Sequence, residues 1–460
     1  MIQRKLKVFA MLGTLFFGAS CAHKEMDQSM AKDGLNLNVK KVVLDNGLRV
    51  LIYENHKLPI FSYYTFFDVG GRYEEGGTTG ATHFLEHMMF KGAKKYGPRQ
   101  FDTFIESNGG STNAYTTFDN TVYYESLPSH AIEKVVDMEA DRLQHLLLEK
   151  QSFEKERQVV LEERKMRYEN SDRGKLYLSM MKEVFQGTPY GGSVIGDKKD
   201  VENLNRDQMR EFFKRFYTPD NAIIVIAGDV DADDTIKMIK DKFGDIKKSE
   251  GLKEYKAKKD DPKRYEFKTK FNRSVRIKGQ SKDPTFFAAY KGVPIGSRKA
   301  YAMDILASII GQGESSYLNQ KWVKSNRPKL AGVYAANYTL KNNGVFYIWG
   351  KLLNKVSLRS FKKDLSRTMR SICKNSISER TLQKTKNKYL VYYYNNVQSN
   401  SDVASFLGDL EFFYGDYKHY KKELEIINSI EVNEVQEVCK EVLSKNERIF
   451  VSIWDKHPKR

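Results

Sequence analysis

His83-Phe84-Leu85-Glu86-His87 is the segment from which the rest of the chain can be interpreted. On a helix, residues four apart project from one face, so the two histidines can hold one metal ion. Zinc favours imidazole and carboxylate ligands, and a catalytic zinc site typically has three protein ligands plus a water. The order is the inverse of the commoner His-Glu-x-x-His helix, and both orders place the glutamate to take a proton from that water. The alternative is a coincidence of five residues on an amphipathic helix.

A third ligand would distinguish a zinc site from a coincidence. The helix predicted over Glu156–Glu163 offers carboxylates that could serve as this ligand. Glu156 and Glu163 are seven residues apart, about two turns, and share a face, whereas Glu162 is turned away by about a third of a circle. Spacing alone does not choose between Glu156 and Glu163. A solvated acidic helix side remains the alternative, because glutamate is common on exposed helices.

Length and composition indicate a globular protein with more than one domain. The 460 residues, 40% apolar and 12% aromatic, are enough for two or three domains with their own cores. After the N-terminus, no apolar run approaches the roughly 20 residues that cross a bilayer. The formal charge of +18 permits attraction to acidic peptides, anionic lipids or nucleic acid. Because the basic residues are dispersed or gathered in the polar stretch 247–268, with no nucleic-acid-binding module, we expect no nucleic-acid partner.

The N-terminus has the pattern of an export signal. A basic start, an apolar stretch and three small residues precede Cys21, as in bacterial lipoprotein signals, in which cleavage leaves that cysteine lipid-modified. Gly18 stands where leucine is usual, and an ordinary signal peptide with an incidental cysteine is the alternative. We predict a signal peptide at 1–21, a polar tether at 22–37, and anchoring on the periplasmic side of a bacterial envelope. Ala22 after the cysteine favours the outer membrane.

Two further cysteines, Cys373 and Cys439, complete the cysteine content. In an oxidising periplasm they could form a disulfide, but the sequence does not show whether their backbones approach closely enough. Two buried free thiols are an equal alternative.

The order of predicted elements repeats along the chain, which indicates duplication of one α/β unit of about 200 residues. We predict a first domain over 38–246, a charged linker over 247–268 and a second domain over 269–460. Residues 298–320 contain no His-x-x-Glu-His, so the second domain should lack the metal. The predicted strands are 42–44, 48–53, 61–69, 111–126 and 222–227 in the first domain, and 275–278, 285–290, 330–338, 345–351 and 449–454 in the second.

These features together resemble the insulinase/pitrilysin family of zinc metallopeptidases, most closely the branch that contains mitochondrial processing peptidase and its bacterial relatives. The resemblance spans nearly all of the chain after the signal. The segments that carry it are HFLEH (83–87), GGSTNAYT (109–116), EADR (139–142), ERQVVLEE (156–163), TPY (188–190), YTPDNA (217–222) and GDV (228–230).

The resemblance implies an α/β (α+β) fold of two homologous domains, each a mixed β-sheet backed by helices, that face each other like a clam shell around a chamber. It places one zinc ion on His83, His87 and Glu163. Glu156 would lie outside the ligand set and orient the ligands. Glu86 would act as the general base and then protonate the leaving amine.

The resemblance also implies that a peptide substrate adds as a strand along the edge that contains Asn113 and Ala114. Main-chain pairing would then supply general affinity and side-chain pockets would add preference. Without the resemblance, Asn113 would be interpreted as a turn residue after the Gly-Gly pair.

One feature of the family is missing. In many relatives the second domain contributes an arginine and, seven residues later, a tyrosine that contact the substrate and the oxyanion. The corresponding positions here are Val323 and about Gly332. Arg327 and Tyr334 lie nearby, but their use would need a shift of two to four residues. We favour true absence and expect a homologous metal-free subunit to supply the pair.

Three functions are compatible with the sequence. We prefer a zinc endopeptidase that works with a partner subunit on extended peptides or unfolded segments in the bacterial envelope. A self-sufficient monomeric or homodimeric peptidase is the second. A noncatalytic envelope peptide-binding scaffold that retains metal is the third, and the intact set of His83, Glu86, His87 and Glu163 argues against it.

Overall fold

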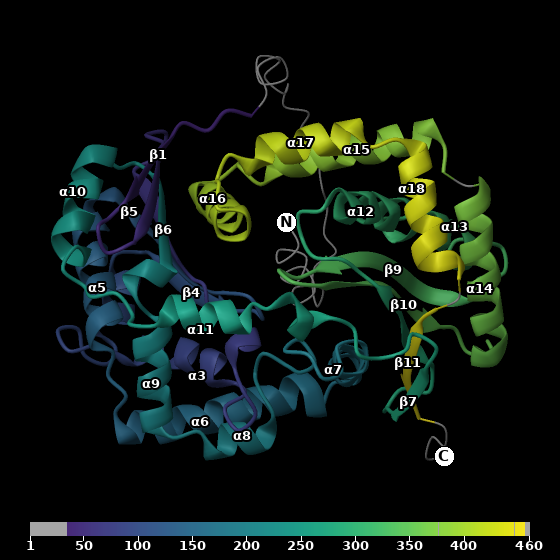
Figure 1. The fold of residues 1–460 in the computed structure, drawn as a ribbon, viewed down its shortest axis with the longest axis horizontal. Helices are drawn as coiled ribbons and strands as arrows, with labels where there is room; N and C mark the ends of the chain where they lie inside the picture. Colours follow the sequence, from purple (N-terminus) through teal and green to yellow (C-terminus); the bar gives the residue numbers. More distant parts are fainter. Residues whose placement is uncertain (1–34, 376, 446, 456–460) are drawn as a thin grey trace.

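The computed structural model describes residues 35–375, 377–445 and 447–455, and two β-sheets with their helices make up this part of the chain (Figure 1). The predicted signal peptide, Cys21 and most of the predicted tether fall outside the described residues. The last residue of that tether, Leu37, is buried, and its backbone N–H donates to the hydroxyl of Tyr420, 3.3 Å away. The prediction of an α/β fold with two mixed sheets is confirmed.

The first sheet has the order β1-β2-β6-β3-β5-β4, with β2 and β6 parallel and the other neighbours antiparallel. A turn at Asp45-Asn46-Gly47, between the strands predicted over 42–44 and 48–53, joins β1 to β2, and Gly47 adopts a left-handed φ of 87°. The bounds are β1 (Val39–Val43), β2 (Arg49–Glu54), β3 (Ile60–Phe67), β4 (Ser111–Thr116), β5 (Thr121–Pro128) and β6 (Ala222–Gly228).

The single strand predicted over 111–126 is wrong, because the chain turns between β4 and β5 at residues 117–120. The hydroxyl of Thr117 accepts hydrogen bonds from the backbone N–H groups of Asp119 and Asn120, each at 3.0 Å. This side-chain cap stabilises a tight turn. The turn leaves β4 at one edge of the sheet, where, among the described residues, it pairs with β5 alone.

Except for the helix over 172–184, the helices of the first half cover one face of this sheet, and their apolar sides form a core with it. Phe84, Val135 and Phe216 from three helices meet Phe61 and Ile224 of the sheet in that core. The helix bounds are α3 (Ala81–Met88), α4 (Gln100–Ser107), α5 (Ile132–His145), α6 (Lys150–Arg164), α7 (Asp172–Val184), α8 (Lys198–Asn203), α9 (Arg206–Phe216), α10 (Ala232–Phe243) and α11 (Leu252–Lys259).

The second half repeats the plan with a sheet of order β7-β11-β8-β10-β9, in which only β7 and β11 are parallel. Strand β9 is one edge of this sheet, as β4 is one edge of the first sheet. The strands are β7 (Ser274–Lys278), β8 (Thr285–Lys291), β9 (Leu330–Thr339), β10 (Gly344–Leu352) and β11 (Ile449–Trp454). The helices are α12 (Arg298–Gly311), α13 (Tyr317–Trp322), α14 (Leu358–Asn375), α15 (Glu379–Asn395), α16 (Asn400–Tyr414), α17 (His419–Ser429) and α18 (Val432–Cys439).

Each half also contributes a helix to the other half's sheet (Figure 1). Helix α16 packs on β3 and β6 of the first sheet, and α7 packs on β8 and β11 of the second. Gly408 permits the first contact, because a Cβ atom there would lie 2.0 Å from the ring of Phe66. On the other side, Met180 of α7 shares a core with Phe287 and Val451 of the second sheet. The two halves therefore share their cores.

The range 247–268, predicted as a charged linker, contains α11 and contributes to a network of charges between the halves. Lys256 forms an ion pair with Asp68 at 2.7 Å, and the Arg72 side chain, completely buried, pairs with Asp119 at 3.1 Å. From the second half, Lys341 reaches Asp68 at 3.4 Å, and its backbone N–H donates to Asp119 at 3.1 Å. Burial alone would raise the pKa of Asp68, but Lys256, Lys341 and Arg72 outweigh it and hold that pKa well below its usual range.

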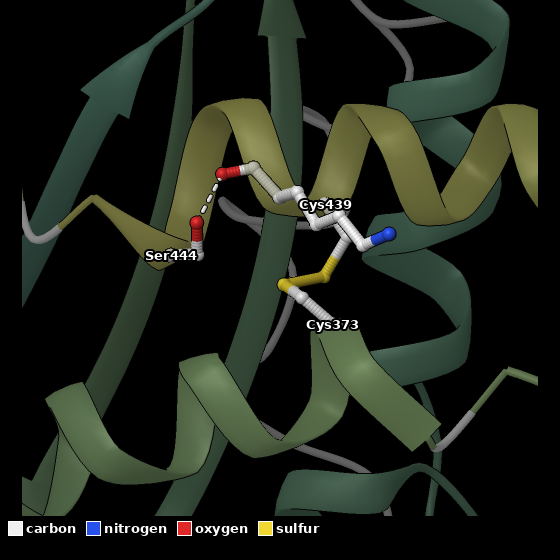
Figure 2. The surroundings of a disulfide bond; sticks show 4 residues. Cys373, Cys439 and Ser444 are labelled. Atoms are coloured by element: carbon white, nitrogen blue, oxygen red, sulfur yellow. Dashed lines mark hydrogen bonds between the residues drawn. A yellow bond between two sulfur atoms is a disulfide. The ribbon is translucent and has the colours of Figure 1, made fainter.

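Figure 2 shows a disulfide between Cys373 on α14 and Cys439 on α18, with a Cα–Cα distance of 5.2 Å. Of the two alternatives for these cysteines, the structure therefore has the disulfide rather than two free thiols. In the same view, the Ser444 hydroxyl donates to the carbonyl oxygen of Lys440 one turn earlier. Within the described ranges, no helix is both long and apolar enough to cross a membrane.

Candidate metal centre

Helix α3 carries both histidines of HFLEH, and its N-terminus is fixed by a carboxylate. Glu74 accepts hydrogen bonds from the backbone N–H groups of Gly80, at 2.7 Å, and Thr82, at 2.8 Å. These groups have no acceptor within the helix, and a carboxylate also suits the positive end of its dipole. Gly80 has a φ of 90°, and a Cβ atom there would lie 2.3 Å from the carbonyl oxygen of Ile195. These contacts fix the N-terminus of α3 one turn before His83.

The structure brings together His83, His87 and Glu163, whose ligand atoms all lie within 4.8 Å of one another. Glu163 Oε2 is 3.6 Å from Nε2 of His83 and 3.3 Å from Nε2 of His87. Helix α6 packs against α3 and supplies this carboxylate. The sequence spacing left Glu156 and Glu163 as equal candidates, and in the structure it is Glu163 that joins the cluster.

The donor set fits a zinc ion. Two imidazole nitrogens and one carboxylate oxygen are the ligands of many catalytic zinc sites, with a further position left for water or substrate. Glu163 Oε2 is buried and faces both rings. Nε2 of His87 lies at ion-pair distance, 3.3 Å, but no donor among the described residues makes a well-aligned hydrogen bond to this oxygen. A buried oxygen of this kind requires an explanation, and a bound cation supplies one.

Glu156 lies on the far side of the His87 ring. Its Oε1 atom is 2.8 Å from Nδ1 of His87, and its Oε2 atom is 2.8 Å from Nζ of Lys91. A carboxylate at Nδ1 fixes the ring orientation and leaves Nε2 facing the cluster. Burial would raise the pKa of Glu156, but the contacts with His87 and Lys91 outweigh it and lower that pKa.

The protonation states of the three clustered groups differ. Burial and the neighbouring His87 lower the pKa of His83 to about 3, so its ring is neutral near pH 7. Burial opposes ionisation of Glu163, but His87, His83 and Arg167 lower its pKa to about 2. Burial would also lower the pKa of His87, but the contacts with Glu156 and Glu163 raise it to about 9. A metal ion that binds here therefore displaces a proton from His87.

Glu86 is half-buried on α3 next to the cluster, not within it. The hydroxyl of Thr116, at the end of β4, donates a hydrogen bond to Glu86 Oε2. Burial raises the pKa of Glu86 to about 7, although Thr116 and His87 act in the opposite direction. A carboxyl group with that pKa can take up and release a proton near neutral pH.

Asn113 and Ala114 lie within β4, opposite Tyr124 and Tyr123 of β5. Asn113 is therefore a strand residue, not part of the turn after the Gly-Gly pair, and its side chain is exposed. The Asn113 side-chain oxygen accepts a hydrogen bond from the N–H of Ala114 at 2.8 Å. The free edge of β4 leads to Thr116 and so to Glu86.

The second half places no arginine at the position expected from the family pattern. Val323 follows α13 and packs against the core, while Gly332 lies in β9 opposite Lys351. Arg327 is exposed in the loop before β9, and Tyr334 is half-buried in β9.

Four residues that surround the site were not predicted from the sequence: Glu74, Lys91, Thr116 and Arg167. Helical spacing could have indicated two of them, because Lys91 follows His87 by four residues and Arg167 follows Glu163 by four. Glu74 and Thr116 reach the helix from loops and strands, so no local pattern marks them.

Comparisons with known proteins agree with this geometry. A family model described as insulinase (peptidase family M16) matches residues 49–198, and a model described as the peptidase M16 inactive domain matches 203–389. This chain belongs to the insulinase (M16) family. The first match covers the metal cluster of this M16 chain, and the second covers much of the half that lacks His-x-x-Glu-His.

Two relatives and two solved structures illustrate the likeness. The M16 chain is 28% identical over 371 residues to the zinc protease PqqE of Helicobacter pylori, covering 80% of this chain and 82% of that protein. It is 28% identical over 344 residues to the mitochondrial-processing peptidase subunit beta of Dictyostelium discoideum, covering 73% and 71%. A protease structure from Helicobacter pylori matches with a TM-score of 0.83 and 25% identity, covering 91% and 99%. A peptidase M16 inactive domain from Pseudomonas fluorescens matches in fold, with a TM-score of 0.80 and 18% identity, covering 92% and 99%.

Proposed function

We propose that this chain is a zinc-dependent endopeptidase that cleaves extended peptides or unfolded segments in the bacterial envelope. The observation that carries the proposal is the convergence of His83, His87 and Glu163 at one point, with Glu86 beside them. Membership of a family with zinc proteases among its members supports a peptidase activity.

The chain's own residues account for the proton transfers. Zinc bound by His83, His87 and Glu163 would polarise the scissile carbonyl and favour ionisation of water. Glu86 takes a proton from the attacking water and delivers it to the nitrogen of the leaving amine. Thr116 holds Oε2 of Glu86, and no described residue forms a hydrogen bond with Oε1, which is therefore available for this transfer.

The substrate would lie along the free edge of β4, at Asn113 and Ala114. That edge has main-chain groups to pair with an extended peptide, and it ends at Thr116, which contacts Glu86. Strand addition positions a peptide without selecting its sequence, which suits a peptidase for varied unfolded segments.

We also propose that a homologous metal-free subunit completes the site. Val323 and Gly332 supply neither a cation nor a phenol where the family pattern has them. The Dictyostelium relative is by its name a subunit. A self-sufficient peptidase that uses Arg327 and Tyr334 is the second candidate, and a noncatalytic scaffold is the third.

An envelope location is supported by two features at opposite ends of the chain. The pattern before Cys21 is typical of a lipoprotein signal, and the disulfide between Cys373 and Cys439 suits an oxidising compartment. We propose a lipid anchor at Cys21 on the periplasmic side of the outer membrane. Fractionation of a Cys21→Ser variant tests it, because membrane attachment and lipid labelling should both be lost.

The peptidase proposal is tested with an unfolded protein as substrate. Cleavage by the purified chain, together with its metal-free relative, should stop when zinc is chelated and return when zinc is restored. Cleavage that continues in the presence of the chelator would contradict a zinc-dependent mechanism.

A further inference from the structure

The two oxygens of the Glu163 carboxylate have different surroundings. Oε2 faces the imidazoles of His83 and His87, at 3.6 and 3.3 Å, and is buried. Oε1 lies 2.6 Å from Nη2 of Arg167. The side chain of Arg167 is 60% exposed and that of Glu163 is 20% exposed, so the guanidinium is the more solvent-accessible partner of the pair.

Contacts away from the metal cluster set the position of Arg167. It lies in a π-helical turn, Lys165–Glu169, that directly follows α6. The first residues of α7 pack on this turn so closely that a Cβ atom at Gly174 would lie 1.6 Å from the carbonyl oxygen of Arg167. Glu169 accepts a hydrogen bond from Nη1 of Arg164 at 2.5 Å and ties the turn to α6. Single π-turns of this kind often occur at functional sites.

We propose that Arg167 is a positioning residue that reserves one oxygen of Glu163 for the metal. By holding Oε1, the guanidinium presents Oε2 alone to the two imidazoles and prevents the carboxylate from turning toward solvent. The inference rests on the proposed zinc site and adds to it a second cation that acts through a ligand.

The contact with Arg167 has a counterpart on the other side of the cluster. Lys91 holds Glu156, and Glu156 holds His87 through Nδ1. Two ligands of the cluster are thus each fixed by a cation, one directly and one through a carboxylate. Groups that orient metal ligands in this way typically change metal affinity about 10- to 100-fold when they are removed.

The competing explanation is an ordinary ion pair on a helix surface. An exposed pair four residues apart contributes little to stability and would have no effect on a metal. The chain contains a pair of the same spacing, Arg215 with Glu211, at 3.3 Å, in which the guanidinium also lies over the ring of Tyr255. Replacement of Arg215 therefore measures what the loss of such a pair does away from the metal.

The test is the dissociation constant for zinc alone, measured by competition with a chelator on the full chain. Arg167→Ala should bind zinc about 10- to 100-fold more weakly than the wild type. Arg167→Lys should recover part of the loss, because an ammonium group can hold one oxygen without the planar fork. Arg215→Ala should bind zinc as tightly as the wild type. The zinc-free Arg167→Ala protein should melt no lower than the zinc-free Arg215→Ala protein, which also loses the contact with Tyr255.

A dissociation constant of Arg167→Ala within about twofold of the wild-type value would overturn the proposal. An equal weakening in Arg215→Ala would do the same, because it would show a general effect of lost charge. If the wild-type chain binds no zinc at all, the proposed function itself fails, and the inference about Arg167 fails with it.

Discussion

The two halves share a plan but differ at one pair of corresponding helices. Helix α3 follows β3 in the first half, and α12 follows β8 in the second. Helix α12 is buried at every position from Ala300 to Gly311, among other helices and β9. Helix α3 is buried on its apolar side, while Glu86 and His87 remain half-buried beside β4 and α6. In the described part of this chain, the candidate metal cluster therefore lies on the helix that keeps one face accessible and meets a carboxylate, Glu163.

The largest effect that we expect is on peptide turnover, because the second half lacks the family's arginine and tyrosine. With Val323 and Gly332 at the family's arginine and tyrosine positions, the isolated chain should bind zinc and cleave peptides poorly. Addition of the metal-free relative should raise turnover about 10²- to 10³-fold, the usual cost of one missing preorganised donor. Steady-state peptide hydrolysis with and without the relative measures this.

The control is a partner in which the supplied arginine is replaced by alanine, which should remove the gain. Full turnover by the purified chain alone, unchanged by the relative, would favour the self-sufficient peptidase.

The next prediction concerns the shared cores. Gly408→Leu should force α16 away from Phe66 and destabilise the whole chain by about 3 kcal/mol, because overpacking at a buried contact displaces backbone. Gly76→Ala provides the control, because a Cβ atom at Gly76 would have no neighbour within 4 Å. Denaturant unfolding followed by fluorescence compares them. Equal midpoints for Gly408→Leu and the control would show that the halves are packed independently.

A smaller effect is expected at Glu156, which contacts His87 of α3. Glu156→Gln should keep zinc but weaken its binding about 10- to 100-fold, since an amide holds the His87 ring less strongly than a carboxylate. Chelator competition gives the affinity. Glu154→Gln is the matched control, because its carboxylate pairs with Arg157 on the same helix. Equal affinities for the two variants would remove the orienting role of Glu156.

The smallest effect concerns the charged contact between the halves. The pKa of Asp68 is depressed in the folded chain, so its contribution to stability is present above the unfolded pKa of about 3.9 and is lost as the pH falls. Each unit by which folding lowers the pKa corresponds to about 1.4 kcal/mol in the free energy of unfolding. Unfolding measured from pH 7 to pH 3 should therefore show a shallower loss for Asp68→Asn than for the wild type. Asp207→Asn, at an exposed carboxylate, should follow the wild-type curve.

If Asp68→Asn and Asp207→Asn gave parallel curves, Asp68 would contribute no pH-dependent stability at this contact.

The sequence was sufficient for the features that depend on local spacing. His83 and His87 on one helix face and the repeated order of strands follow from short-range patterns, and the structure has both. The turn at Thr117 was not predicted, because strand-forming residues flank it on both sides. The hydrogen bonds of the Thr117 hydroxyl that stabilise it cannot be recognised from sequence spacing. The exchange of α7 and α16 was missed for another reason. An apolar helix face shows that a helix packs, but not on which of two similar sheets.

The other site residues that were not predicted make contacts between segments far apart in the sequence. Glu74 caps α3 from a loop, and Thr116 reaches Glu86 from the far end of β4. The disulfide between Cys373 and Cys439 joins residues 66 apart in the sequence. Such pairings depend on the folded chain as a whole.

The central claim is that His83, His87 and Glu163 hold zinc while Glu86 performs proton transfer without holding it. Zinc content and peptide hydrolysis, measured on the same preparations of Glu86→Gln, Glu163→Gln and His83→Ala, test it most directly. We predict that Glu86→Gln keeps about one zinc per chain and loses hydrolysis, whereas the other two lose zinc. Loss of zinc from Glu86→Gln as complete as from His83→Ala, or tight zinc in Glu163→Gln, would contradict the account.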